Sequence, residues 1–388
     1  MVALISKIRN VWILRFLDFP RFLTLSIFLI FLFNEYLIYY LAIVRCGWKS
    51  NDQTKIMVIA DTHLLGVQKG HWFDKLRREY QMYRSFQTAS YLLRPDAVFF
   101  LGMCKKKVML SDLFDEGQWG DDNQFERYVD RFNSLFYVNE KVKRYTVVGN
   151  HDIGFHYAIM PRNVDRFNRH FGHNPGIERV ELNGNHFILI NSMAMEGDYC
   201  RLCAGAVKEI DRIADIFNCS INRDSSCKQK LDTPYSRPIL MQHFPLHRKS
   251  DLECMETDDL APPMVREEKF RERWECLSEK STQLLIEKFR PRAAFGGHVH
   301  YGCQKWWTSG GFWEYTVASF SWRNNRRPSF LLLTLSPQEM HVDRCFLPNE
   351  HTVYFIYAIG LIICSTGLLF YCIKGKRFNR QKPERLIY

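Results

Sequence analysis

Residues capable of binding metal ions recur at the ends of short apolar runs in the middle of this 388-residue chain. Each apolar run is typical of a buried β-strand. Five polar blocks follow such runs, in the order "DTH" (61–63), "DLFD" (112–115), "GNHD" (149–152), "QHFP" (242–245) and "GGHVH" (296–300). Because loops that follow parallel strands gather at one edge of a sheet, we expect these side chains to meet there. Carboxylates and imidazoles together suit manganese, iron or zinc, and the set is too rich in nitrogen for calcium.

The order and spacing of the five blocks resemble the calcineurin-like metallophosphoesterase superfamily, whose pattern is D-x-H, G-D-x-x-D, G-N-H-[DE], a lone His and G-H-x-H. The resemblance covers roughly residues 56–319. It implies an α/β fold, a four-layer α/β/β/α sandwich, and two divalent ions, with Mn²⁺ as the expected metal. Carried over to the matching positions, it implies that Asp61, His63 and His300 hold one ion, that Asn150, His243 and His298 hold the other, and that Asp112 bridges both.

Four further residues receive roles from the same resemblance. His151 is expected to stabilise the transition state or to protonate the leaving group. Asp115 and Asp152 are expected to orient the metal ligands through hydrogen bonds. His156, in "GNHDIGFHY", either approaches the substrate or is an ordinary loop histidine.

The spacing of the ligands favours a shared site on local geometry as well. Asp61 and His63 stand two residues apart on a segment expected to be extended, so their side chains should point the same way. The same expectation applies to His298 and His300. Two divalent ions about 3.5–4 Å apart lower the pKa of a bridging water and clamp the phosphate oxygens.

Longer stretches, among them "VIADTHLLG", "LMQHFPLHR", "FGGHVHYGC" and "YTVASFSWRNNRRPSF", are similar to a membrane-bound branch of the superfamily. This resemblance implies a phosphodiesterase that removes a side-chain ethanolamine phosphate from the second mannose of glycosylphosphatidylinositol (GPI) anchors. Its substrates would be GPI-anchored proteins leaving the endoplasmic reticulum, with cargo receptors as further partners. The alternatives are a lumenal phosphomonoesterase or nucleotide pyrophosphatase, and a non-catalytic membrane adaptor on a phosphoesterase fold.

Two apolar segments, 22–44 and 352–373, are long enough to cross a bilayer of about 30 Å. Glu35 interrupts the first segment, whose length and flank argue against a cleaved signal peptide. Basic residues on the outer flanks predict that both termini are cytosolic. The expected parts are a cytosolic segment (1–21), a transmembrane helix (22–44), a lumenal catalytic domain (48–350), a second transmembrane helix (352–373) and a basic tail (374–388).

The formal net charge of +11 does not indicate nucleic-acid binding, because no motif for it is present. Anionic lipid headgroups explain the basic flanks better, so membrane lipids are expected partners. The resemblance places the protein in endoplasmic reticulum exit sites, the intermediate compartment and the Golgi. In an oxidising lumen several of the 12 cysteines should pair, including those of "CRLC" (200–203).

One stretch departs from the superfamily pattern. "MCKKKVMLS" (103–111) separates Gly102 from Asp112, which the pattern places next to each other. Removing the insert restores G-D-x-x-D, and we expect it to arise from alternative splicing and to lower activity. Without Cys104, an even number of cysteines remains from Cys200 to Cys345, if Cys46 is set aside.

Apolar periodicity predicts strands near 54–60, 96–102, 144–150, 185–192, 238–245 and 293–300, with helices near 74–93 and 123–138. A long charged helix is expected from about 266 to 290, and an antiparallel end piece after residue 311. Alternating strands and helices of this kind indicate one α/β domain whose sheets pack between helices.

Overall fold

The computed structural model describes residues 19–64, 71–102, 120–172, 176–196, 200, 202–222, 227, 229–255 and 257–380, with side chains up to residue 373. The chain divides into two compact units. The smaller unit takes both ends of the chain, up to Leu41 and from Pro348, and the larger unit is Ala42–Leu347.

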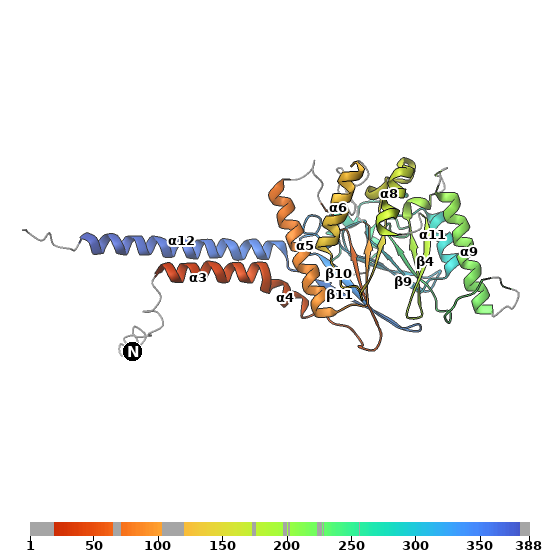
Figure 1. The fold of residues 1–388 in the computed structure, drawn as a ribbon, viewed down its shortest axis with the longest axis horizontal. Helices are drawn as coiled ribbons and strands as arrows, with labels where there is room; N and C mark the ends of the chain where they lie inside the picture. The colour runs from red at the N-terminus through yellow and green to blue at the C-terminus, as the bar shows by residue number, and fades with distance from the viewer. Residues whose placement is uncertain are drawn as a thin grey trace, which may run out of the picture. The chain divides into compact units, whose positions relative to one another are not determined.

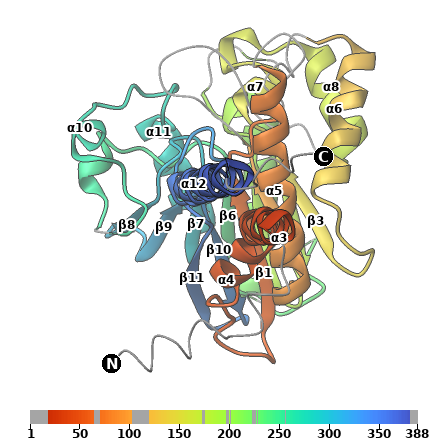
Figure 2. The ribbon, with the colours of Figure 1, turned by 90° about the vertical axis from the view of Figure 1, so that its left-hand side faces the viewer.

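Two β-sheets form the centre of the larger unit, and Figure 2 shows their strands side by side. The five-stranded sheet has the order β11-β10-β1-β2-β3, and its strands are β1 (Thr54–Ala60), β2 (Ala97–Leu101), β3 (Lys143–Val147), β10 (Ser329–Leu335) and β11 (Met340–Phe346). The six-stranded sheet has the order β4-β5-β6-β7-β9-β8, and its strands are β4 (Ile177–Leu182), β5 (Asn185–Ile190), β6 (Ile239–Gln242), β7 (Ala293–Gly296), β8 (Cys303–Trp307) and β9 (Phe312–Thr316).

Both sheets are mixed. Strands β1, β2 and β3 are parallel, and β10 pairs antiparallel with β1 and with β11. In the second sheet β5, β6, β7 and β9 are parallel, whereas β4 and β8 form antiparallel edges. The expectation of a purely antiparallel end piece is therefore wrong for β9, which extends the parallel order beside β7.

Side chains that alternate along β1 face two different apolar layers. Val58 belongs to the core between the sheets, together with Phe187 and Phe295 of the other sheet. Met57 and Ile59 point to the outer face and pack in the layer that the helices cover.

Helices cover the outer face of each sheet (Figure 1). Phe86 of α5 (Trp72–Leu93) and Phe132 of α6 (Asp122–Leu135) pack on Phe100 of β2, with ring centroids 6.0 and 5.0 Å away. On the other sheet, Phe217 of α9 (Cys203–Asn222) contacts His186 and also Phe289 of α11 (Glu279–Phe289). The layer order α/β/β/α confirms the predicted fold.

Residues with specific conformational preferences set several helix ends. Asp121 accepts the amide of Gln124 at 2.7 Å and so begins α6. Helix α8 (Pro161–Phe171) has proline in its first turn and ends at Gly172, whose φ of 68° suits glycine. The larger unit also contains the short helices α7 (Asn150–Ile153) and α10 (Pro263–Arg266) and the 3₁₀ turns η2 (His156–Ala158), η3 (Ser192–Ala194) and η4 (Asp251–Glu253).

The long helix expected from 266 to 290 is half wrong. Helix α11 begins only at Glu279, and the residues between α10 and α11 are irregular. Their backbone bonds to a distant loop instead, since Phe270 donates to the Lys249 carbonyl at 2.8 Å and Leu277 to the Pro245 carbonyl at 2.9 Å. These long-range bonds replace helical ones, and charge patterning along the sequence does not reveal them.

Four disulfides link the described part of the chain: Cys46–Cys345, Cys200–Cys203, Cys219–Cys227 and Cys254–Cys303. The two cysteines of "CRLC" thus pair with each other. The even-number argument is wrong, because Cys46 pairs with Cys345 and Cys276 stays free and buried. Cys104 and the rest of the 103–111 insert lie outside the described residues.

The smaller unit contains α3 (Phe19–Leu32), the π-helical turn η1 (Phe33–Leu37) and α12 (Glu350–Arg380); α4 (Ile38–Ile43) continues the first of these into the larger unit. Two helical stretches, Pro20–Ile43 and Glu350–Ile373, are long and apolar enough to cross a membrane. Glu35 lies in the π-helical turn and accepts a hydrogen bond from the Tyr357 hydroxyl. This bond lowers the cost of keeping a carboxyl group among apolar helices.

The Cys46–Cys345 disulfide closes the larger unit across a sequence separation of 299 residues. Replacing both cysteines by serine should lower the free energy of unfolding by about 2–5 kcal/mol, because the unfolded chain regains the entropy of that loop. Denaturant unfolding of the detergent-purified protein measures the loss, with Cys372→Ser, which removes a free exposed thiol, as control. Equal unfolding midpoints for the paired-serine variant and the parent would show that this bond does not stabilise the fold.

Candidate metal centre

Three buried side chains form a first cluster beyond the end of β1 and β7. One ligand atom from each of Asp61, His63 and His300 lies within 4.8 Å of the others. Nε2 of His63 is 3.1 Å from Nε2 of His300, so the two imidazoles face each other with the same ring atom. Asp61 follows β1 directly and His300 follows β7, so the two sheets each supply part of the cluster.

A second cluster lies beside the first. Nε2 of His243 is 3.1 Å from Oδ1 of Asn150 and 3.1 Å from Nδ1 of His298. Asn150 begins the short helix α7 after β3, and His243 follows β6. The carboxylate of Asp61 joins the two clusters, because its Oδ2 accepts the backbone N–H of His298 at 3.0 Å. The structure thus brings together six of the seven residues expected to hold metal, in the two expected groups of three.

The backbone of these ligands is not extended as expected. Asp61, His63, His298 and His300 all have positive φ, at 55°, 50°, 76° and 66°. An extended segment would direct the side chains of residues i and i+2 to one face, whereas here the backbone turns at each ligand of the D-x-H and H-x-H motifs. Non-glycine residues adopt this conformation rarely and at a cost of about 1–3 kcal/mol each, typically at functional sites.

Burial keeps the imidazoles neutral. It lowers the pKa of His63 well below its usual value, and the neighbouring His300 lowers it further. Burial followed by the neighbouring His298 does the same to the pKa of His243. Burial also lowers the pKa of His298 to about 3, against the opposing hydrogen bond to the Trp274 carbonyl. Neutral imidazoles retain a lone pair, which is the form that binds metal.

The nitrogen and oxygen atoms that face one another in the second cluster offer more hydrogen-bond acceptors than hydrogens. His298 Nε2 is 2.6 Å from the Trp274 carbonyl and must carry the proton there, which leaves Nδ1 as an unprotonated nitrogen facing His243. His243 Nε2 also faces the Asn150 oxygen and can donate to only one of these two acceptors. A divalent cation in each cluster would satisfy these lone pairs, so the donor set fits the dimetal chemistry of the superfamily. Bound there, the metals would acidify a water molecule and neutralise phosphate oxygens.

Several residues that sequence reasoning missed hold the ligands in place. The Trp274 carbonyl fixes the tautomer of His298. Ser319 Oγ donates to the Asp61 carbonyl at 2.7 Å, and its own amide donates to the His300 carbonyl at 3.0 Å. No local signal in the S-F-S-W motif that contains Ser319 predicts this contact.

The backbone at Gly102 packs directly against two parts of the site. Its amide donates to the Val147 carbonyl and its carbonyl accepts from Asp61. A Cβ at this position would lie 2.8 Å from the backbone of Gly149 and 2.8 Å from Cγ of His243. Only glycine therefore fits between the "GNHD" turn and the His243 ring.

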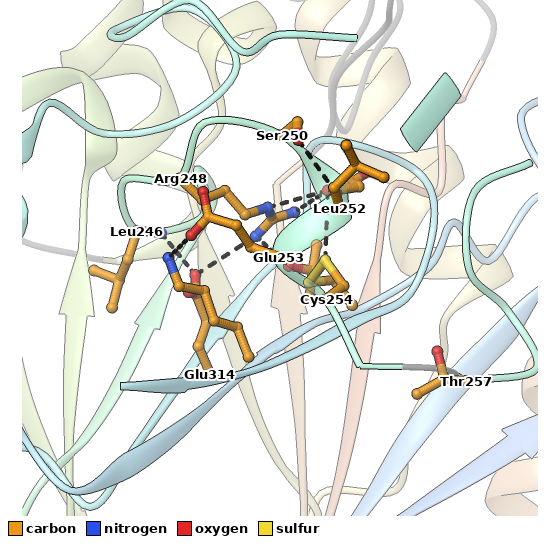
Figure 3. Close-up of a disulfide and its surroundings, with 12 residues drawn as sticks. Leu246, Arg248, Ser250, Leu252, Glu253, Cys254, Thr257 and Glu314 are labelled. Carbon is orange, nitrogen blue, oxygen red and sulfur yellow. Dashed lines mark hydrogen bonds and ion pairs between the residues drawn. A yellow bond between two sulfur atoms is a disulfide. The ribbon is translucent and has the colours of Figure 1, made fainter. Parts of the chain in front are cut away.

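A buried ion cluster supports the loop that carries His243 (Figure 3). Arg248 donates to Asp251 through Nε at 3.0 Å and Nη2 at 2.8 Å, and to Thr316 Oγ1 at 3.0 Å. Glu314, whose pKa is raised by burial, accepts the Leu246 amide at 2.7 Å. These bonds attach the loop to β9 and so help to fix the position of His243 at the end of β6.

A second grouping of possible ligands, Asp251, Cys254 and Cys303, lies beside this ion cluster. Its two sulfur atoms are joined in a disulfide, so neither can be the thiolate that a metal requires. The disulfide instead ties the loop to the beginning of β8.

The remaining predicted residues fall into two groups. His151 is buried in α7, close enough to lower the pKa of both His63 and His243. Asp152 accepts the Gly149 amide at 3.0 Å and so closes the turn that contains Asn150. His156 is buried in the turn that follows, edge-on to the Tyr157 ring. Asp112, predicted to bridge the metals, and Asp115 lie outside the described residues.

Residues 54–302, more than half of the chain, match the family described as calcineurin-like phosphoesterase. The chain is 40% identical to metallophosphoesterase 1 of Gallus gallus over 352 residues, covering 86% of this chain and 85% of that protein. It is 42% identical to a metallophosphoesterase 1 homologue of Caenorhabditis elegans over 350 residues, covering 87% and 88%. A solved dimetal phosphatase from Danio rerio is similar at 13% identity and a TM-score of 0.41, covering 75% of this chain and 95% of that one.

Replacing His243 by alanine should remove one metal ion per chain and nearly all turnover, because His298 and Asn150 cannot close that cluster alone. Metal analysis of the purified protein after dialysis measures the stoichiometry. His341→Ala, which removes a half-exposed histidine from β11, should retain both ions and serves as control. Two ions per chain in the His243 variant would contradict the assignment of this ligand.

The lowered histidine pKa values predict a pH dependence for the metal-free protein. A histidine with a pKa of about 3 when folded and 6.5 when unfolded stabilises the fold above pH 6.5, and that contribution falls as the pH drops toward 3. For His298 alone the loss between pH 7.5 and pH 5 should be about 2 kcal/mol.

Denaturant unfolding in EDTA at the two pH values measures this loss. His298→Gln removes the titrating group, so its stability should fall less between pH 7.5 and pH 5 than that of the parent. The same fall in both proteins would contradict the linkage.

Proposed function

Because the chain belongs to the calcineurin-like phosphoesterase family and is a metal-dependent phosphoesterase, we propose that it acts as a two-metal phosphodiesterase on GPI anchors. The reaction removes a side-chain ethanolamine phosphate from the second mannose of the anchor. One observation carries the proposal of a competent centre: two buried clusters, each with three converging ligand atoms, are linked by the hydrogen bond from the His298 amide to the Asp61 carboxylate. The substrate follows from the resemblance to the membrane-bound branch of the superfamily, and the 40% identity to metallophosphoesterase 1 supports it.

The residues of the centre take the following roles in this proposal. Asp61, His63 and His300 hold one ion, Asn150, His243 and His298 hold the other, and Asp112 bridges them. The metals are Mn²⁺ ions, which accept this mixture of oxygen and nitrogen ligands. His151, buried in α7 near His63 and His243, donates a proton to the leaving alcohol. Asp115 and Asp152 orient the ligands.

The compartment is the lumen of the early secretory pathway. Four disulfides in the described chain suit an oxidising lumen, since cytosolic proteins keep their cysteines reduced. The two helices that can cross a membrane would anchor the enzyme at exit sites of the endoplasmic reticulum, the intermediate compartment and the Golgi, with both termini cytosolic. The substrates are GPI-anchored proteins. Cargo receptors and membrane lipids are further partners, and nucleic acid is not a partner.

Purified protein loaded with Mn²⁺ tests the substrate directly. Ethanolamine-phosphate glycans are offered beside p-nitrophenyl phosphate and nucleotide sugars. Release of ethanolamine phosphate from the glycan is the expected result. Hydrolysis of monoesters or nucleotides alone would identify a lumenal phosphomonoesterase or nucleotide pyrophosphatase instead.

Asp61→Ala tests whether the protein is catalytic at all. This carboxylate joins the two clusters, so its removal should abolish turnover and lower the metal content. A parent protein that carries no transition metal and behaves like Asp61→Ala would instead be a non-catalytic membrane adaptor.

Deleting residues 103–111 should raise metal content and turnover. The deletion places Asp112 directly after Gly102, which lies at the centre against Gly149 and His243. It also removes three lysines whose charge opposes cation binding. Metal analysis and turnover of the two forms, side by side, measure the effect, and equal values would contradict it.

A further inference from the structure

Three aromatic side chains form an exposed surface next to the candidate metal centre. The rings of Phe155, Tyr157 and Trp274, termed the aromatic platform, lie with centroids 4.8 Å (Phe155 to Trp274), 5.4 Å (Tyr157 to Trp274) and 6.0 Å (Phe155 to Tyr157) apart. Tyr157 is 61% exposed and Trp274 is 37% exposed. The platform joins two segments more than a hundred residues apart, so it is a product of the tertiary fold.

The platform is continuous with the metal ligands. The Phe244 ring lies 4.1 Å from that of His298 and 6.3 Å from that of Phe155. Phe155 is 6.4 Å from His151, and the Trp274 carbonyl accepts the proton of His298 Nε2. A ligand held on the platform would therefore lie beside the atoms that act on phosphate.

Exposed aromatic rings in contact with one another are costly to leave in water. Single exposed apolar residues are common on protein surfaces, but contiguous ones beside a polar centre are typical of ligand sites. The irregular 267–277 segment also gives up helical hydrogen bonds while it holds Trp274 at this place. Both observations favour a binding role over a packing role for the exposed rings.

The charge at the platform selects the kind of ligand. The Arg271 guanidinium lies 5.1 Å over the Trp274 ring and donates through Nε to Glu275 at 3.1 Å, while the Arg271 backbone amide donates to the same carboxylate at 2.9 Å. A cation thus already occupies the attractive position over this ring, which disfavours a second one such as an ethanolamine ammonium group. A neutral ligand with one apolar face and polar edges fits better.

We propose that the aromatic platform binds a hexopyranose ring of the substrate. The C–H face of the sugar stacks on the exposed Tyr157 ring and packs against the part of Trp274 that Arg271 leaves uncovered, and its hydroxyl groups bond to the exposed Arg271 at the rim. This inference rests on the proposed function in one respect: it takes the bound ring to be the mannose that carries the cleaved ester. It makes the platform a specificity determinant that positions the sugar, separate from the groups that hydrolyse the ester.

Two substrates that differ only in the alcohol test the platform. One is a methyl mannoside that carries ethanolamine phosphate, and the other is glycerophosphoethanolamine, which has the same phosphate and ammonium groups without a sugar. In Tyr157→Ala and Trp274→Leu the ratio of kcat/KM for the mannoside to that for the glycerol ester should fall about tenfold or more. Trp274→Phe should recover part of the ratio. Substitution at Trp274 keeps the backbone carbonyl that contacts His298.

Tyr137→Ala is the matched control, because Tyr137 is 63% exposed and precedes β3, at the edge of the sheet opposite the metal centre. It should keep the parental ratio. An equal loss for both substrates in the platform variants would overturn the proposal, since the rings would then recognise the ethanolamine or support the ligands.

Saturation-transfer NMR with methyl α-mannopyranoside separates this inference from the proposed function. The parent should transfer saturation to the sugar, and the two platform variants should not. If the parent hydrolyses neither ester but still shows this difference, the platform stands and the proposed reaction fails. No transfer in the parent would overturn the platform whatever the enzyme hydrolyses.

Discussion

The structure depends on burying several neutral imidazoles whose ring nitrogens face one another. Each such contact can use only one hydrogen, and burying these polar groups costs free energy unless they are paired. His63 faces His300, and His243 faces both His298 and Asn150, each at 3.1 Å. The fold holds this arrangement in place, and a cation bound there would take up the ring lone pairs. The two sheets, the left-handed turns and the hydrogen bonds around the ligands all serve this one constraint.

A two-sheet sandwich meets the constraint because the ends of both sheets open onto the same space. Asp61 and Asn150 follow strands of the five-stranded sheet, whereas His243, His298 and His300 follow strands of the other. Each cluster therefore takes ligands from both sheets. The apolar layer between the sheets fixes their separation, so the spacing of the ligands is set by the core rather than by the loops themselves.

The contacts around the ligands also reach the protein surface. Trp274 serves the centre through its carbonyl, which orients His298, and presents its ring to solvent beside Tyr157. Arg248 and Glu314 fasten the loop of His243 to the neighbouring strand. The irregular segment 267–277, through Trp274, thus connects the metal ligands with an exposed aromatic surface.

The sequence by itself indicated an α/β domain and the chain positions of most of its strands, because apolar alternation is a local property. The resemblance to the superfamily supplied the four-layer arrangement and the expected ligands. Glu279 as the true beginning of α11, the positive φ of Asp61 and the pairing of Cys46 with Cys345 were decided by the tertiary structure. Each of these depends on a partner far away in the chain. Backbone hydrogen bonds to residues 245–249 overrode the helical pattern before Glu279. Long-range backbone bonds from Asp61 to Gly102 and from Ser319 to His300 accompany the turns at the ligands. A local sequence pattern does not indicate which distant residues will be in contact, so only the folded structure shows them.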